Sequence, residues 1–110
     1  MDYLQKEQET VRRLYAYICK KESISPVPLI FKNVGKGGAA CKFSGHEVIA
    51  IEMDLRRIQA GACYCLCHEV AHKIQIVNHA NPSHNAPFKR EFNRLYKRYQ
   101  NSKIANQLIF

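Results

Sequence analysis

The chain of 110 residues lacks any apolar run near the roughly 18 residues that a membrane-spanning helix needs. Residues 1–10 are polar and charged, unlike the apolar centre of a secretory signal peptide. Repeats and low-complexity stretches are also missing, and apolar (46%) and charged (24%) residues occur at ordinary globular frequencies. We therefore expect one domain over residues 1–110, located in the cytoplasm and without a membrane partner.

The sequence also lacks an even set of spaced cysteines that could pair in disulfides, and it is poor in acidic residues. Its five cysteines are odd in number, and Cys63, Cys65 and Cys67 crowd into one segment, which is unlike a secreted disulfide framework. We expect free thiols that pack as small apolar side chains. Nine acidic residues stand against 17 Lys and Arg, giving a net charge of +8 that attracts phosphates or acidic partners without specifying which.

A nucleotide-binding loop is absent as well. Gly35, Gly37 and Gly38 lie close to Lys32 and Lys36, but neither GxxxxGK[ST] nor GxGxxG occurs. The glycines are instead typical of a hairpin turn between two strands.

What is present predicts an α+β fold. Apolar spacing predicts a first helix over residues 5–21, and short β-branched runs predict two or three strands within residues 27–31, 39–43 and 48–53. Apolar residues recur at helical spacing over 55–77, which predicts a long helix with Asp54 as its N-cap. After a loop over residues 78–87, the pattern from Phe88 predicts a last helix that frays toward Phe110.

The sequence His68-Glu69-Val70-Ala71-His72 lies inside the predicted long helix, where positions four apart share one face and can bind one metal ion. Zinc accepts neutral imidazoles, and a catalytic zinc has three protein ligands and a fourth position left to water. Glu69 could take a proton from that water and deliver it to a leaving amine. We therefore predict zinc as the cofactor, His68 and His72 as ligands and Glu69 as general base.

The third ligand must come from outside this pentapeptide. His84, in the loop after the helix, can fold back over it, whereas His79 misses the metzincin spacing by one residue and is discounted. Glu91 on the last predicted helix stays an alternative carboxylate ligand. A closed structural zinc site would favour four Cys or His ligands and leave Glu69 without a role, so we favour a catalytic site.

Residues 67–88, CHEVAHKIQIVNHANPSHNAPF, resemble the SprT-like zincin metallopeptidases, in which an HExxH helix is followed by a loop histidine and an aromatic residue. The family loop reads roughly His-Gly-x-x-Phe, and here it reads HNAPF. The resemblance implies a minimal zincin-like domain in which His84 is the third zinc ligand and Phe88 packs nearby. Asn85 stands in place of the glycine, and since Asn tolerates left-handed backbone, we expect it to keep the same turn.

The resemblance also implies a zinc metallopeptidase with a peptide or protein substrate. Family members include DNA-dependent proteases that cut proteins crosslinked to DNA. Zincins commonly hold substrate against an edge strand near the active helix, and residues 39–43 or 48–53 could provide that edge. Tyr96, Tyr99 and His79 are candidates for stabilising the oxyanion that forms on the attacked carbonyl.

The last predicted helix carries a different hypothesis. It is basic and opposed by a single acid, Glu91, and its cations are Lys89, Arg90, Arg94, Lys97, Arg98 and Lys103. A solvated helix face is the simpler interpretation of such a pattern, but the same pattern is also typical of a surface that binds nucleic acid. The alternative function is therefore a basic nucleic-acid- or protein-binding module whose zinc site is structural or vestigial.

Overall fold

The computed structural model describes residues 2–34, 37–45, 47–58, 60–79 and 84–109, with residues 76–79 described by their backbone only. The elements are α1 (Tyr3–Glu22), β1 (Leu29–Phe31), β2 (Ala39–Ser44), β3 (Glu47–Met53), α2 (Ala62–His79), α3 (Ala86–Tyr99) and the 3-10 helix η1 (Ala105–Gln107). The predicted α+β class, with a first helix, three short strands and two further helices, is confirmed. None of the described helices combines the length and apolar character that crossing a lipid bilayer would require.

Helix α1 begins and ends with recognisable caps. The side chain of Asp2 accepts from the backbone N of Gln5, and the side chain of Gln5 accepts in return from the backbone N of Asp2. Ser23 ends the helix in the left-handed conformation, with φ 55°. The face between these caps packs into the core through Val11, Leu14, Tyr15 and Ile18.

The sheet has the order β1-β3-β2, with β3 parallel to β1 and antiparallel to β2. The strand over residues 39–44 is therefore an edge and β3 is central, which decides between the two edge candidates. The prediction of a hairpin at the glycines that follow β1 is wrong: β1 and β2 do not pair, because β3 lies between them. The hairpin joins β2 to β3 beside Gly45 (φ 62°) instead, and Gly35 and Lys36 lie outside the described residues.

The predicted N-cap role of Asp54 is also wrong, because α2 begins only at Ala62. Oδ1 of Asp54 accepts from the backbone N of Arg56 at 3.1 Å and so closes a turn after β3. Leu55 is buried from within this turn. Apolar spacing reports burial rather than backbone conformation, and here a buried turn imitates the first turn of a helix.

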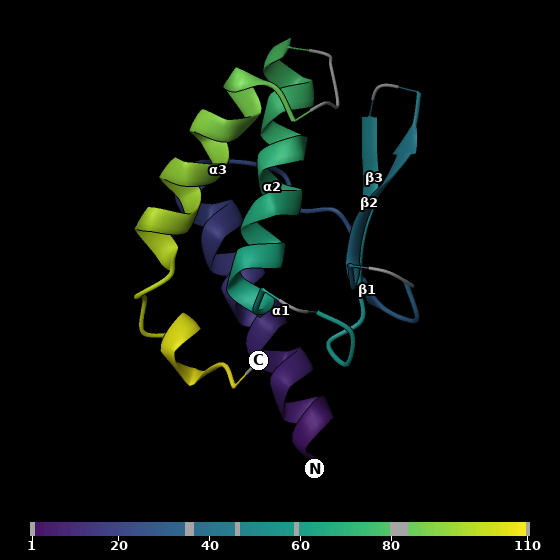
Figure 1. The fold of residues 1–110 in the computed structure, drawn as a ribbon, viewed down its shortest axis with the longest axis vertical. Coiled ribbons are helices and arrows are strands. Elements are labelled where there is room, and N and C mark those ends of the chain that lie inside the picture. Colours follow the sequence, from purple (N-terminus) through teal and green to yellow (C-terminus); the bar gives the residue numbers. More distant parts are fainter. Residues whose placement is uncertain (1, 35–36, 46, 59, 80–83, 110) are drawn as a thin grey trace.

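Helix α2 is the centre of the molecule: the sheet covers one side, α3 lies along another, and α1 passes behind it (Figure 1). Over residues 62–75, its buried apolar residues are Ala62, Cys65, Leu66, Cys67, Val70, Ala71 and Ile74. Fully burying a large apolar side chain contributes roughly 1.5–3 kcal/mol to the stability of the fold. Because these residues contact the sheet and the other helices, the packing holds α2 from several directions. The side chains that α2 presents at its remaining open side are thereby fixed in position.

Glu22 at the end of α1 anchors α3. Its carboxylate accepts from Arg94 (2.8 Å), Arg98 (3.0 Å) and the hydroxyl of Tyr99 (2.6 Å). Burial alone would raise the pKa of Glu22, but these hydrogen bonds and the two positive charges outweigh it and hold the pKa below its ordinary value. Helix α3 ends at Tyr99, where turns and η1 follow, so the expected fraying toward Phe110 is not observed over residues 100–109.

Candidate metal centre

Three histidines meet where α2 and the start of α3 lie side by side. His68 and His72 are one turn apart on α2, His84 precedes α3, and one nitrogen from each lies within 4.8 Å of the other two. The ring centroids are 4.9 Å (His68–His72), 5.0 Å (His68–His84) and 4.9 Å (His72–His84) apart. Three imidazoles bound tetrahedrally to one ion at about 2.0–2.1 Å would have centroids about 5 Å apart. The spacing therefore fits a single metal ion.

The three rings differ in their exposure to solvent. His72 is buried, the side chain of His68 is 29% exposed, and His84 lies at the surface. A metal ion held by these rings would face protein on the His72 side and solvent on the His84 side. Such a site is open to water on the His84 side, as a catalytic metal requires.

Gln75 sets which nitrogen of His72 can bind a metal. Nε2 of Gln75 donates to Oδ1 of Asn85 at 2.9 Å, which turns its Oε1 toward Nδ1 of His72 at 3.2 Å. An amide oxygen only accepts, so Nδ1 carries the proton and Nε2 keeps its lone pair. Burial lowers the pKa of His72, which keeps the ring neutral at pH 7. Its Nε2 lies 3.1 Å from Nε2 of His84, close to the separation of two ligand atoms on one ion.

The hydrogen bonds from His72 through Gln75 to Asn85 form what we call the relay, and Asn85 extends it to the start of α3. Its Oδ1 also accepts from the backbone N of Phe88 at 3.1 Å and thus caps the helix. The left-handed turn expected at Asn85 is wrong: its φ is −81° and its ψ −176°, the extended backbone that an N-cap adopts. A side-chain oxygen, which glycine lacks, is what this position uses.

Glu69 orients His68. Its Oε2 lies 2.8 Å from Nδ1 of His68, so the carboxylate accepts the Nδ1 proton and Nε2 of His68 is left to bind a metal. Glu69 is buried on the side facing β2, where the Cys41 thiol donates to its backbone oxygen at 3.4 Å. Burial and then the charge of Glu69 raise the pKa of Cys41, so this thiol stays protonated at neutral pH.

Phe88 packs directly on the centre. Its ring stacks on His72 with centroids 4.4 Å apart and an interplanar angle of 25°, and it is buried. It also meets the edge of His68 at 5.0 Å. Its centroid is also 4.9 Å from that of His84, so the aromatic residue that follows the loop histidine contacts all three candidate ligands.

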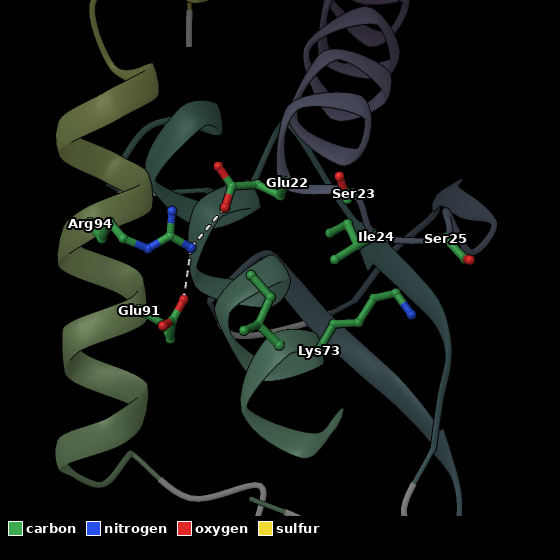
Figure 2. Close-up of a pocket in the computed structure, with 8 residues that line it drawn as sticks. Glu22, Ser23, Ile24, Ser25, Lys73, Glu91 and Arg94 are labelled. Atoms are coloured by element: carbon green, nitrogen blue, oxygen red, sulfur yellow. Dashed lines mark hydrogen bonds and ion pairs between the residues drawn. The ribbon is translucent and has the colours of Figure 1, made fainter. Parts of the chain in front are cut away.

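The competing ligand Glu91 lies elsewhere. Its carboxylate pairs with Arg94 at 2.8 Å, and both line a cleft of about 670 Å³ between the end of α1, α2 and α3, together with Lys73 (Figure 2). Among the described residues, His68, His72 and His84 form the only group of three that could hold a metal ion. The side chain of His79 lies outside the described residues.

The oxyanion candidates on α3 face other partners. The hydroxyl of Tyr99 donates to Glu22, away from the histidines. The ring of Tyr96 meets the edge of Tyr64 at 5.4 Å. All five cysteines are free, and Cys65 and Cys67 are buried as expected of small packing residues.

Sequence reasoning missed Gln75 and Asn85. Gln75 lies three residues after His72, a spacing that places both on one face of a helix. Asn85 comes two residues before Pro87, which is typical of an N-cap ahead of a first-turn proline. Either pattern could have indicated these positions. Their hydrogen bond to each other joins two elements and could not have been read from spacing.

Comparison of the chain with family models, with curated proteins and with solved structures found no match. The arrangement of the histidines, Glu69, Gln75 and Asn85 is therefore the basis for a functional assignment.

Proposed function

We propose that this chain is a zinc metallopeptidase of the SprT-like zincin type, with zinc bound by His68, His72 and His84. The observation that carries the proposal is the meeting of three imidazoles whose spacing fits one tetrahedral ion and whose exposure leaves one side open. An all-imidazole set suits zinc among the common metals, although copper, iron and nickel also accept it.

The two buried partners support a metal-binding state of the histidines. Glu69 holds the Nδ1 proton of His68, and Gln75 holds that of His72. Both rings then leave Nε2 for a metal ion, and His72, whose pKa burial lowers, need not lose a proton to bind a cation at neutral pH.

Glu69 is the proposed general base. When bound, the metal would lower the pKa of its water toward 7 and polarise the substrate carbonyl. While one oxygen of Glu69 holds His68, the other accepts a proton from water as the water oxygen bonds to the peptide carbonyl carbon. Glu69 then delivers this proton to the amide nitrogen as the C–N bond breaks. The products are a carboxylic acid and an amine, and proton transfer from the acid to the amine yields a carboxylate and an ammonium group.

The test is Glu69→Gln, compared with Glu91→Gln as a matched control. A glutamine at position 69 can still accept from His68, so we expect both variants to retain about one zinc per chain. Hydrolysis of an unfolded protein substrate should fall by about 10²–10⁴-fold in Glu69→Gln only, since general base catalysis contributes that much. Equal activity of wild type and Glu69→Gln would overturn the proposed role.

The alternative, a basic binding module, draws on three exposed cations of α3. Lys89, Arg90 and Lys97 are exposed and form no ion pair with any described residue, whereas Arg94 and Arg98 are held by Glu22. Unpaired surface cations attract phosphates or acidic protein surfaces. Under this alternative the histidine centre is structural or vestigial, and Glu69→Gln changes neither binding nor stability.

A further inference from the structure

Aromatic rings extend from the metal centre along the line where α2 and α3 meet. Helix α2 contributes three rings at four-residue spacing and so does α3, and together they form what we call the aromatic strip: Tyr64, His68, His72, Phe88, Phe92 and Tyr96. Residues four apart lie on one face of a helix, so each helix presents a row of rings to the other.

The two rows meet in reverse order because the helices run antiparallel (Figure 1). Ring centroids are 4.4 Å apart for His72–Phe88, 6.0 Å for His68–Phe92 and 5.4 Å for Tyr64–Tyr96. Along α3, Phe88–Phe92 and Phe92–Tyr96 stack with interplanar angles of 4° and 5°. Each ring is held by its neighbours, so the strip is a preformed surface.

Core packing accounts for one end of the strip fully and for the other only in part. The buried residues of α3 are Phe88, Leu95 and Tyr99, which already attach the helix to the core. Phe92 and Tyr96 pack against the core but are only partly buried, and Tyr64 is 36% exposed. Clustered aromatic surface that stays open to solvent is typical of contact sites, and here it is continuous with the candidate metal ligands.

We propose that the open end of the aromatic strip is the subsite for an aromatic or large apolar side chain of an extended, acidic peptide segment bound at the metal centre. This inference rests on the proposed peptidase function and names its substrate class. Acidic neighbours are expected because α3, which carries half of the strip, also carries the exposed lysines Lys89 and Lys97, which have no ion-pair partner among the described residues, and because the chain has a net charge of +8.

The ring geometry favours a peptide side chain over a nucleic-acid base. Bases bind proteins by stacking on free aromatic faces. In the strip, Phe92 lies between the nearly parallel rings of Phe88 and Tyr96, whose centroids are 6.1 and 5.9 Å away, and the ring of Tyr64 meets Phe92 at 4.8 Å with an interplanar angle of 75°. Because these rings flank it, Phe92 leaves a base less room to stack than an isolated ring would, whereas an apolar side chain needs no free face.

The experiment compares two fluorogenic peptides that carry aspartates and differ only in one residue, Phe or Gly, near the cleaved bond. We expect zinc-loaded wild type to prefer the Phe peptide by about 10–100-fold in kcat/KM, as burial of one large apolar side chain allows. Tyr64→Ala should reduce this preference at least threefold while zinc content stays at wild-type level. Tyr3→Ala is the matched control, since it removes an exposed tyrosine (56%) from α1 and should leave the preference unchanged.

The outcomes separate this inference from the function on which it rests. Cleavage without a Phe preference, or with a preference that neither Tyr64→Ala nor Tyr96→Ala reduces, overturns the subsite and leaves the peptidase intact.

If no peptide is cleaved, the same Phe and Gly peptides are titrated against the zinc-loaded protein and monitored by NMR. Tighter binding of the Phe peptide that Tyr64→Ala weakens supports the strip without the enzyme, and equal binding overturns it. Stronger binding of a thymidine oligonucleotide than of the Phe peptide also overturns it.

Discussion

Nε2 of Gln75 donates a hydrogen bond of 2.9 Å to Oδ1 of Asn85, and this contact joins the helix that carries two candidate ligands to the turn that carries the third. The relay continues to Nδ1 of His72 at one end and to the backbone N of Phe88 at the other. The tautomer of a ligand and the start of α3 are thereby coupled.

Substitution of Gln75 should weaken metal binding without touching a ligand. Gln75→Leu removes the acceptor at Nδ1 of His72 while filling a similar volume, and we expect zinc affinity to fall about 10–100-fold. Gln75→Glu keeps an acceptor and should stay closer to wild type. Competition with a chromophoric chelator measures both. Equal affinity of Gln75→Leu and wild type would show that the relay does not serve the metal.

Asn85→Gly, which restores the residue of the SprT-like pattern, separates capping from the relay. Glycine is a tolerable N-cap, so loss of the cap should cost a few tenths of a kcal/mol in Asn85→Gly and about 1 kcal/mol in Asn85→Ala, in addition to the cost, common to both, of removing the acceptor of the buried Gln75 amide. Both variants lose the acceptor for Gln75, and we expect both to bind zinc more weakly. Urea unfolding and chelator competition provide the two readouts. A glycine variant with wild-type affinity would contradict the coupling.

His84→Ala and Glu91→Ala decide the third ligand. We expect His84→Ala to lose bound zinc and the thermal stability that zinc confers, because metal bound only to the native state raises apparent stability. Glu91→Ala should keep both, since Glu91 pairs with Arg94. Metal analysis after purification without chelators, followed by thermal melts, tests this. Loss of zinc in Glu91→Ala alone would assign the carboxylate instead.

The metal-free protein should lose stability as pH falls below the ordinary histidine pKa. The pKa of His72 is lowered in the fold by burial, so the unfolded chain binds a proton near pH 6.5 that the folded chain does not yet accept. This contribution is present above about pH 6.5 and is lost below it. Urea unfolding of chelator-treated protein at two pH values on either side of this pKa should show the loss in wild type. A His72→Gln variant should lose less, and an equal loss would contradict the assignment.

The basic-module alternative is tested best at cations that carry no structural role. Reversal of Lys89, Arg90 and Lys97 to glutamate should change stability by less than about 0.5 kcal/mol, because all three are exposed. If they contact phosphates, DNA affinity falls and the slope of log affinity against log salt flattens by about 0.9 per contact. An unchanged slope removes the DNA hypothesis. Arg98 is unsuitable for this test, since its reversal would set two carboxylates against each other at Glu22.

The sequence correctly predicted helices and strands whose burial pattern is visible within one segment. Its predictions failed where the structure depends on contacts between residues distant in sequence. Strand and helix periods identified α1, the three strands and α3, and the four-residue spacing of His68 and His72 identified one face of α2. The period could not distinguish the buried turn at Leu55 from a helix. Neither the central position of β3 nor the bond from Gln75 to Asn85 is encoded by spacing, because each depends on a partner distant in sequence.

The candidate ligands and their relay all lie within α2, α3 and the connection between them, whereas β1 reaches β3 through pairs such as Leu29 with Ile51. Closing a short loop between adjacent helices costs less chain entropy than pairing separated strands, and contacts close in sequence form faster. We therefore expect the helical hairpin to be structured early in folding and β1 to join late. Substitutions in Leu66 should then slow refolding of the zinc-loaded protein, whereas substitutions in Leu29 should mainly accelerate its unfolding.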